Sequence, residues 1–324
     1  MHIFKFIFLV MLLSPLIHSF EEGAIYNEDI KIIYRDYGPK DAEPIVLVQG
    51  LGGQLINWPD HLIDFLIENN FRPIVFDNRD SGLSSKIQSD MFKEGNRSKT
   101  INSTYLKYYL MLPIDPPYTL DDMAEDVILI LDQLEIKESH LLGMSMGGMI
   151  AQIVAANHPD RIKSFTLIAS SISAPSPLNG PTRDVRRLLM KRSNNPNASI
   201  EERIERSKKI FRLIGLEGYD IDTEEFYNKS VESINRAGPD DTGFSRQIMA
   251  ILGSKNRLQK VKSIKAKTLI IHGADDPLIK VKNAYKAHKI IKNSELIIIP
   301  NMRHLIEPPV FNKFKYNLLN HLNK

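Results

Sequence analysis

Cysteine is absent from the 324 residues of this chain. The absence excludes disulfide bonds, thiolate metal ligands, a cysteine nucleophile and a lipid attached through cysteine. A strong charge of one sign is also missing, because 42 basic and 39 acidic residues leave a net charge of +3. Such a balanced surface gives no reason to expect nucleic acid or another strongly anionic macromolecule as a partner.

Long apolar segments are missing everywhere except near the N-terminus. The run Phe6–Leu13 follows Lys5 and is too short to span a bilayer, and Ser14-Pro15 ends it. This pattern predicts a signal peptide over residues 1–19 and a mature chain that begins at Phe20, rather than a buried segment or an uncleaved anchor. We therefore expect export to the periplasm or beyond, with no integral membrane segment after signal removal and no cysteine-anchored lipid.

Eight short segments have the composition of strands, and helical patterns separate most of them. Continuous apolar runs bounded by glycine are typical of strands that are buried on both faces of a parallel sheet. Alternating strands and helices predict an α/β fold with a mostly parallel eight-stranded sheet covered by helices on both faces. The expected strands are Ala24–Tyr26, Lys31–Tyr37, Pro44–Val48, Pro73–Phe76, His140–Gly143, Ile162–Ala169, Thr268–Ile271 and Glu295–Ile299.

Residues 172–262 interrupt this alternation, because they hold amphipathic helical stretches and no convincing buried strand. The expected helices are Thr182–Lys191, Ile200–Ile214, Thr223–Asn235 and Phe244–Ile251. We interpret the segment as a helical cap, or lid, inserted into a core made of residues 20–171 and 263–324. Residues 85–118 lack clear periodicity and are expected to form a long excursion.

The pentapeptide Gly143-Met144-Ser145-Met146-Gly147 lies between an expected strand and an expected helix. That context is typical of a nucleophile elbow, a turn so tight that only very small residues fit two positions before and after the serine. The alternative is a glycine-rich turn with an incidental serine. We predict Ser145 as the nucleophile.

A base must remove the hydroxyl proton before Ser145 can attack. Chains with a nucleophile elbow present the serine, the acid and the histidine in that order. Of the nine histidines, His304 lies in the loop after the last expected strand. Asp275 and Asp276 follow the preceding strand, and we favour Asp276 because Pro277 imposes an extended backbone on it.

The oxyanion of a tetrahedral intermediate needs two N–H donors. The N–H of Met146 points from the N-terminus of the helix after the elbow, where the helix dipole favours negative charge. The loop Gln49–Gly53 follows the Pro44–Val48 strand, and we predict the N–H of Leu51 as the second donor.

Other polar segments carry weaker signals. The loop Asp77–Ser84 is expected to bond to the oxyanion loop rather than act in acid–base or metal chemistry. No His or carboxylate cluster has metal-ligand spacing, and neither a dinucleotide fingerprint nor a phosphate loop occurs. Some aromatic residues are candidates for the wall of a pocket, although ordinary packing is the commoner role: Trp58, Tyr105, Tyr108 and Tyr109.

Five parts of the chain together resemble the α/β-hydrolase superfamily: Gln49–Gly53, Asp77–Ser84, Gly143–Gly148, His272–Pro277 and His304. The similarity runs from about residue 30 to 310 and is to bacterial hydrolases near the aclacinomycin methylesterase group, with a close match at Pro117–Ala124. It implies an α/β-hydrolase fold with a helical cap, hydrolysis of carboxylic esters through a Ser-His-Asp triad, and no cofactor.

Two departures from the pattern of this superfamily stand near the expected site. Gln49 replaces a histidine that many members have, which leaves the backbone donor unchanged. Asn301 and Arg303 replace the glycines that usually precede the catalytic histidine. We expect Arg303 to narrow or charge the entrance of the site.

The sequence thus predicts a serine hydrolase that acts on a small-molecule ester through an acyl-enzyme. Two alternatives stay open: hydrolysis of another bond (amide, lactone or C–C), and a non-catalytic binding protein that reuses the fold. The sequence specifies neither the acyl and alcohol groups nor the oligomeric state.

Overall fold

The computed structural model describes residues 19–27, 30–93, 96–177, 179–190, 198–238, 242–254 and 257–324. The predicted signal peptide lies outside the described residues except for Ser19, so it stays a prediction. Within the described residues, no helix combines the length and the apolar character needed to cross a bilayer.

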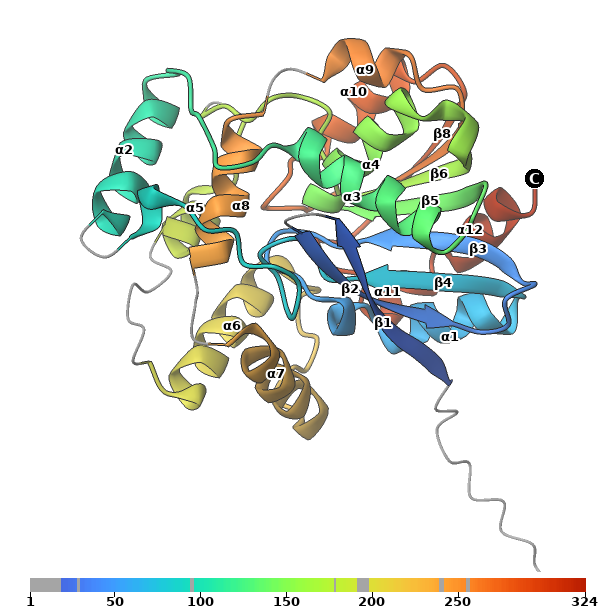
Figure 1. Cartoon of the computed structure of the whole chain (residues 1–324), viewed down its shortest axis with the longest axis horizontal. Helices are drawn as coiled ribbons and strands as arrows, with labels where there is room; N and C mark the ends of the chain where they lie inside the picture. Colours follow the sequence, from blue (N-terminus) through green and yellow to red (C-terminus); the bar gives the residue numbers. More distant parts are fainter. Residues whose placement is uncertain are drawn as a thin grey trace, which may run out of the picture.

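An eight-stranded sheet with the order β1-β2-β4-β3-β5-β6-β7-β8 forms the centre of the molecule (Figure 1). β1 and β2 pair antiparallel, and so do β2 and β4, whereas all later neighbours are parallel. The mostly parallel eight-stranded sheet predicted from the sequence is confirmed. Its strands are β1 (Phe20–Asn27), β2 (Ile30–Tyr37), β3 (Glu43–Val48), β4 (Phe71–Phe76), β5 (Ser139–Met144), β6 (Ile162–Ile168), β7 (Lys267–Gly273) and β8 (Ser294–Ile299).

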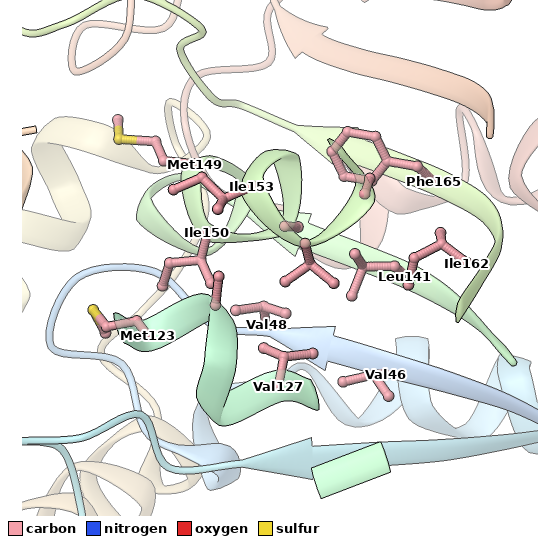
Figure 2. Close-up of a cluster of buried hydrophobic side chains, with 14 of the residues drawn as sticks. Val46, Val48, Met123, Val127, Leu141, Met149, Ile150, Ile153, Ile162 and Phe165 are labelled. Carbon is pink, nitrogen blue, oxygen red and sulfur yellow. The ribbon is translucent and has the colours of Figure 1, made fainter. Parts of the chain in front are cut away.

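Helices cover both faces of the sheet because its central strands are apolar on both sides. In β3, Val46 and Val48 point to one core cluster, while Ile45 and Leu47 point to the other. This follows from the two-residue period of a strand. The first cluster contains side chains of α3 (Leu120–Gln133), α4 (Met146–Asn157) and α10 (Lys282–Ile290), and Figure 2 shows part of it.

The opposite face is covered by helices from the two ends of the chain. α1 (Asp60–Glu68), α11 (Pro308–Phe311) and α12 (Lys315–Leu322) pack their apolar side chains on this face in the second cluster. At the C-terminus the sequence predicts a single last helix over Val310–Asn320. The structure divides it, because Asn312 ends α11 and Phe314 begins α12 as its N-cap residue.

A set of helices follows β6 and precedes β7, and all but the last of them lie beyond the carboxyl ends of the parallel strands (Figure 1). These are α5 (Arg183–Met190), α6 (Ile200–Ile214), α7 (Glu224–Ala237), α8 (Thr242–Leu252) and α9 (Leu258–Lys262). The start of α6 is set by a capping box, in which Ser199 and Glu202 satisfy each other's backbone N–H. α9 packs on α4 and α10, so the chain returns to the core before β7 begins.

Two helices, α2 (Arg97–Tyr109) and the five-residue α9, were not predicted from the sequence. Residues 85–118 were expected to form a long excursion without clear periodicity, and α2 lies within them and packs near α8. The helix buries only Thr104 fully, so its sequence has almost no apolar stripe from which to recognise it.

A pair of buried histidines lies away from the cap. His140 in β5 holds Ser164 of β6 at 2.8 Å through Nδ1, and burial lowers its pKa from 6.5 to about 4. Burial likewise lowers the pKa of His321 in α12 to about 4. Both imidazoles are therefore neutral in the folded chain at pH values where an unfolded histidine is charged.

We predict that the free energy of unfolding falls as the pH is lowered from about 6.5 to about 4. Across that window the unfolded chain binds protons that the folded chain cannot, which costs about 3 kcal/mol for each histidine. Urea titrations at pH 7.5 and pH 4.5 measure the effect. His140→Asn should lose part of the drop, and an identical drop in the variant would contradict the assignment to His140.

Candidate functional site

Ser145 lies at the sharp turn between β5 and α4. Its backbone has φ 57° and ψ −120°, a left-handed conformation that non-glycine residues rarely adopt. The turn is held because the Ser145 N–H donates to Ile168 O at 3.0 Å, while Ser170 Oγ donates to Ser145 O at 2.7 Å. This strained position turns the Ser145 side chain toward the cavity described below.

Close backbone packing explains the glycines around the elbow. A Cβ on Gly147 would lie 1.9 Å from Val48 O, and one on Gly143 would lie 2.6 Å from Gly147 O. A Cβ on Gly148 would lie 2.6 Å from the Cβ of Ser170. No larger residue fits these positions without moving the backbone, as the spacing of the glycines predicts.

The structure brings His304 and Asp276 together. His304 Nδ1 lies 2.8 Å from Asp276 Oδ2, and both side chains are buried. Asp276 Oδ1 accepts from the N–H groups of Leu278 and Ile279 at 2.8 and 2.9 Å. These hydrogen bonds stabilise the ionised carboxylate, and the one to Nδ1 fixes the orientation of the imidazole.

Opposing effects act on the ionisation of Asp276. Burial raises the pKa of its carboxyl, but the neighbouring His304, His272 and the Ile279 N–H outweigh burial and hold the pKa below 3.8. His272 Nε2 lies 3.5 Å from Asp276 Oδ2 and 2.7 Å from Ile279 O. Because a carbonyl only accepts, Nε2 of His272 carries a proton and also faces the carboxylate. Asp276 is consequently an anion at neutral pH.

The neighbouring carboxylate has a different task. Asp275 is exposed, and its Oδ2 accepts from the Asn301 N–H at 3.1 Å. Asn301 has φ 63°, which accounts for asparagine where a glycine is common, since both tolerate the left-handed region. Asp275 and Asn301 thus shape the loop that carries His304, and Asp275 does not contact the imidazole.

The loop after β3 places N–H groups beside Ser145. A Cβ on Gly50 would lie 3.2 Å from the Ser145 Cβ, so the two segments approach closely. The N–H groups of Gly50, Gly52 and Gly53 donate to Gln49 Oε1, Gln247 Oε1 and Gly50 O. Among the described residues the N–H of Leu51 has no such acceptor, and Met146 is at the first position of α4, where helices leave the N–H unpaired.

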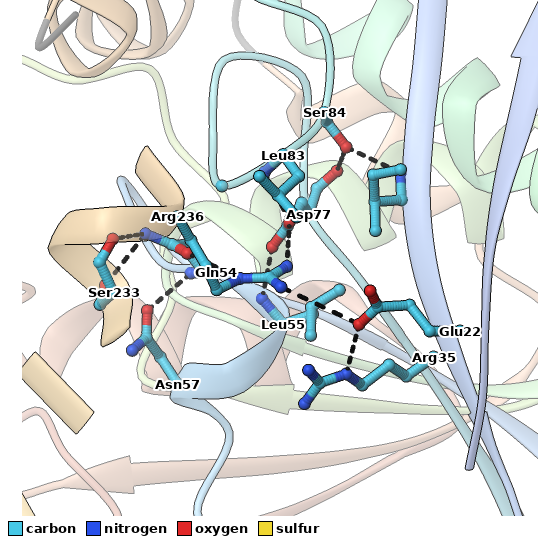
Figure 3. Close-up of polar contacts among 12 residues, drawn as sticks. Glu22, Arg35, Gln54, Leu55, Asn57, Asp77, Leu83, Ser84, Ser233 and Arg236 are labelled. Carbon is cyan, nitrogen blue, oxygen red and sulfur yellow. Dashed lines mark hydrogen bonds and ion pairs between the residues drawn. The ribbon is translucent and has the colours of Figure 1, made fainter. Parts of the chain in front are cut away.

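Buried polar contacts fix this loop from behind. Asn78 Nδ2 donates to Gln49 O at 3.0 Å, as expected of the Asp77–Ser84 segment. Asp77 accepts from the Leu55 and Leu83 N–H groups and pairs with Arg236 of α7 at 2.8 Å (Figure 3). The loops after β3 and β4 are thereby tied to one another and to the cap.

A second cap helix contributes to the same anchoring. Arg246 of α8 pairs with Asp80 through two nitrogens at 2.9 and 2.6 Å. Gln247, the next residue, accepts from Gly52 and donates to Arg79 O at 2.9 Å. The roles of Gln247 and Arg236 could not be predicted from the sequence, because nothing in a cap helix signals which distant loop its side chains will meet.

Cap and core enclose a cavity of about 950 Å³ that is lined by Ser145 and His304. Gly50, Leu51 and Met146 line it too, so all the predicted oxyanion donors face the same space. Within the described residues Ser145 Oγ has no hydrogen-bond partner, and no hydrogen bond joins it to His304. An approach of the two groups when a substrate binds is common for sites of this kind.

Not all of the residues predicted near the cavity line its wall. Trp58, Tyr105 and Tyr108 line it, whereas Tyr109 is exposed and packs edge-on against Tyr108. Arg303 was expected to narrow or charge the entrance, and this was wrong. Its guanidinium turns to Glu217 at 2.7 Å and to Arg212 O at 3.3 Å, so it joins the His304 loop to the end of α6.

Within the part of the chain that the structure describes, no group of three or more His, Asp or Glu side chains is arranged to hold a metal ion. The arrangement of Ser145, His304 and Asp276 is suited to acid–base and nucleophilic chemistry of side chains. A buried anion orients an imidazole, and both the imidazole and a strained serine line one cavity.

Comparison with known proteins identifies the same fold. The model of the α/β-hydrolase fold family matches residues 43–306. A rhodomycin D methylesterase of Streptomyces peucetius is 23% identical over 297 residues, which cover 87% of this chain and 91% of the relative.

Solved structures agree with this finding. A hydrolase from Pseudomonas aeruginosa has a TM-score of 0.67 at 21% identity and covers 94% of this chain and 98% of its own. The enol-lactonase from Burkholderia xenovorans has a TM-score of 0.68 at 18% identity and covers 94% and 100%. At these identities the likeness shows the fold alone.

Substitution of the adjacent Asp275 and Asp276 tests which of the two carboxylates supports His304. Asp276→Asn should lower kcat for a 4-nitrophenyl ester by about 10³–10⁴-fold, because an amide cannot stabilise the imidazolium and selects the wrong tautomer. Asp275→Asn should change kcat by less than about tenfold, because its side chain only accepts the Asn301 N–H. Steady-state kinetics on both variants decide, and the reverse order of effects would overturn the assignment.

Proposed function

Because this chain belongs to the α/β-hydrolase fold family, we propose that it is a serine-dependent hydrolase of carboxylic esters. The observation that carries the proposal is the buried Asp276–His304 pair, whose imidazole lines one cavity together with the strained Ser145. Relatives named as esterases support hydrolase activity, among them the methylesterase that aligns over most of this chain.

In the proposed reaction His304 Nε2 removes the proton of Ser145 Oγ as that oxygen attacks the ester carbonyl carbon. The imidazole becomes imidazolium, and the Asp276 anion stabilises the new charge through Nδ1. The carbonyl oxygen becomes an oxyanion, and the N–H groups of Leu51 and Met146 donate to it. Both donors are held by backbone packing before the substrate arrives, so they need no reorganisation.

Collapse of this intermediate breaks the bond to the leaving alkoxide, which takes the proton from His304 Nε2 and departs as the alcohol. Ser145 is then acylated. A water molecule gives a proton to His304 and attacks the acyl carbon. When this second tetrahedral intermediate collapses, His304 returns the proton to Ser145 Oγ and the acid leaves. The balance needs one water per ester and no oxidant or reductant.

Other bonds are open to the same residues. An amide, a lactone or a C–C bond next to a carbonyl needs the same nucleophile and oxyanion donors, and the lactonase named above has the same fold. We favour a small-molecule ester because the methylesterase relatives align over more than four fifths of this chain. A purely binding role would leave the geometry of Ser145, His304 and Asp276 without a purpose.

We expect Ser145→Ala to lower kcat/KM for a 4-nitrophenyl ester by at least about 10⁴-fold, because the nucleophile is lost. Ser173→Ala is the matched control. Ser173 is in the same cavity wall, but its hydroxyl accepts a hydrogen bond from Lys286 Nζ and, in the described part of the chain, has no histidine beside it as a base. We therefore expect its loss to change the activity little. Circular dichroism checks the fold of both variants. Wild-type activity in Ser145→Ala would contradict the proposal.

A further inference from the structure

The charged residues that the first two cap helices contribute to the cavity wall are of one sign. From α5 and α6 these are Arg186, Arg203 and Arg206, and neither helix adds a carboxylate to the wall. The other residues that these two helices add to the wall are apolar except for Ser207, and they include Leu189, Ile210 and Ile214. Cations in an otherwise apolar wall mark a position where a ligand's charge would be recognised.

Arg186 has donors to spare. Its Nη2 donates to Pro177 O at 3.2 Å and to Pro181 O at 3.1 Å, which orients the side chain. Its Nε is buried and has no hydrogen-bond partner among the residues that the structure describes. A buried donor without an acceptor costs free energy, and an oxygen from a bound ligand would remove that cost.

Arg206 is still less engaged. It is half-buried in the cavity wall, and within the described ranges it makes neither a hydrogen bond nor an ion pair. Arg203 precedes it by three residues on the same helix, so the two cations share one face of α6. Both side chains line the cavity, so an anion bound there would meet two positive charges.

The carboxylates of the cavity wall come from other elements and have contacts of their own. Asp60 and Glu225 both pair with Lys229, and Asp80 pairs with Arg246. Glu307 accepts from the Leu216 N–H at 2.7 Å, and Asp220 accepts from the Asp222 N–H at 2.8 Å. No carboxylate of the described residues pairs with Arg186 or Arg206.

We propose that Arg186 and Arg206 form a subsite for a carboxylate on the substrate, so that the preferred ester is a monoanion with an apolar body. The inference rests on the proposed function and adds to it the class of substrate. A guanidinium offers planar paired donors that match the two oxygens of a carboxylate, and the apolar wall excludes water that would compete. The reacting ester carbonyl would lie at Ser145 while the carboxylate lies under the cap.

Pairs of esters of equal chain length test the subsite. We would compare the mono-4-nitrophenyl esters of adipic and suberic acid with 4-nitrophenyl hexanoate and octanoate, subtracting the rate of Ser145→Ala. The wild type should favour the monoanion in kcat/KM by about tenfold or more for at least one chain length. A preference for the neutral ester at both lengths would overturn the inference while leaving the proposed function in place.

Variants assign the preference to the two arginines. Arg186→Gln and Arg206→Gln should each lower kcat/KM for the monoanion by about tenfold and change that for the neutral ester by less than about twofold. Arg187→Gln and Lys209→Gln are the matched controls, since both side chains are exposed on the same helices and outside the cavity wall. Unchanged discrimination in both cavity variants would contradict the assignment.

A binding measurement separates this inference from the reaction itself. Trp58 is the only tryptophan, and it lines the cavity, so its fluorescence reports occupancy. Ser145→Ala should bind monomethyl adipate more tightly than methyl hexanoate, and Arg206→Gln introduced into that variant should remove the difference. Equal affinities for the two methyl esters would overturn the subsite, whether or not the protein hydrolyses esters. A failure of the wild type to hydrolyse any ester would instead refute the proposed function.

Discussion

Contact between the backbone of the elbow and the end of β3 is the constraint on which the site depends. Gly147 lies so close to Val48 O that even a methyl group would overlap it. This contact presses the N-terminus of α4 against the loop that follows β3. The strained φ of Ser145 and the short distance between Gly50 and the Ser145 side chain are found at this same contact.

The cap is fastened to this centre by charge as well as by packing. Arg236 and Arg246 reach from α7 and α8 to Asp77 and Asp80, in the loop that supports the loop Gln49–Gly53. Removing one partner of a buried pair leaves an uncompensated charge and typically costs about 3–5 kcal/mol. α6 is joined instead to the His304 loop, where the His304 N–H donates to Ile214 O at 2.8 Å. Cap and reacting groups are therefore one connected unit.

The strands and the elbow could be predicted from the sequence because their signals lie within a few consecutive residues. A strand buried on both faces must be apolar throughout, and a tight turn requires glycine at fixed positions, so both features are legible in a few residues. α2 escaped notice because a helix that buries little needs no apolar stripe. The direction of Arg303 and the exposure of Arg186 and Arg206 to the cavity depend on how cap and core meet, which no local pattern encodes.

The central claim is that Ser145 is the reactive nucleophile among all the hydroxyl groups of the chain. A fluorophosphonate reacts covalently with a serine that an adjacent base activates and leaves unactivated hydroxyls unmodified. Incubation of the whole protein followed by peptide mapping in a mass spectrometer should find one phosphonyl group per chain, on the peptide containing Ser145. The absence of labelling, or a label on another residue, would contradict the account.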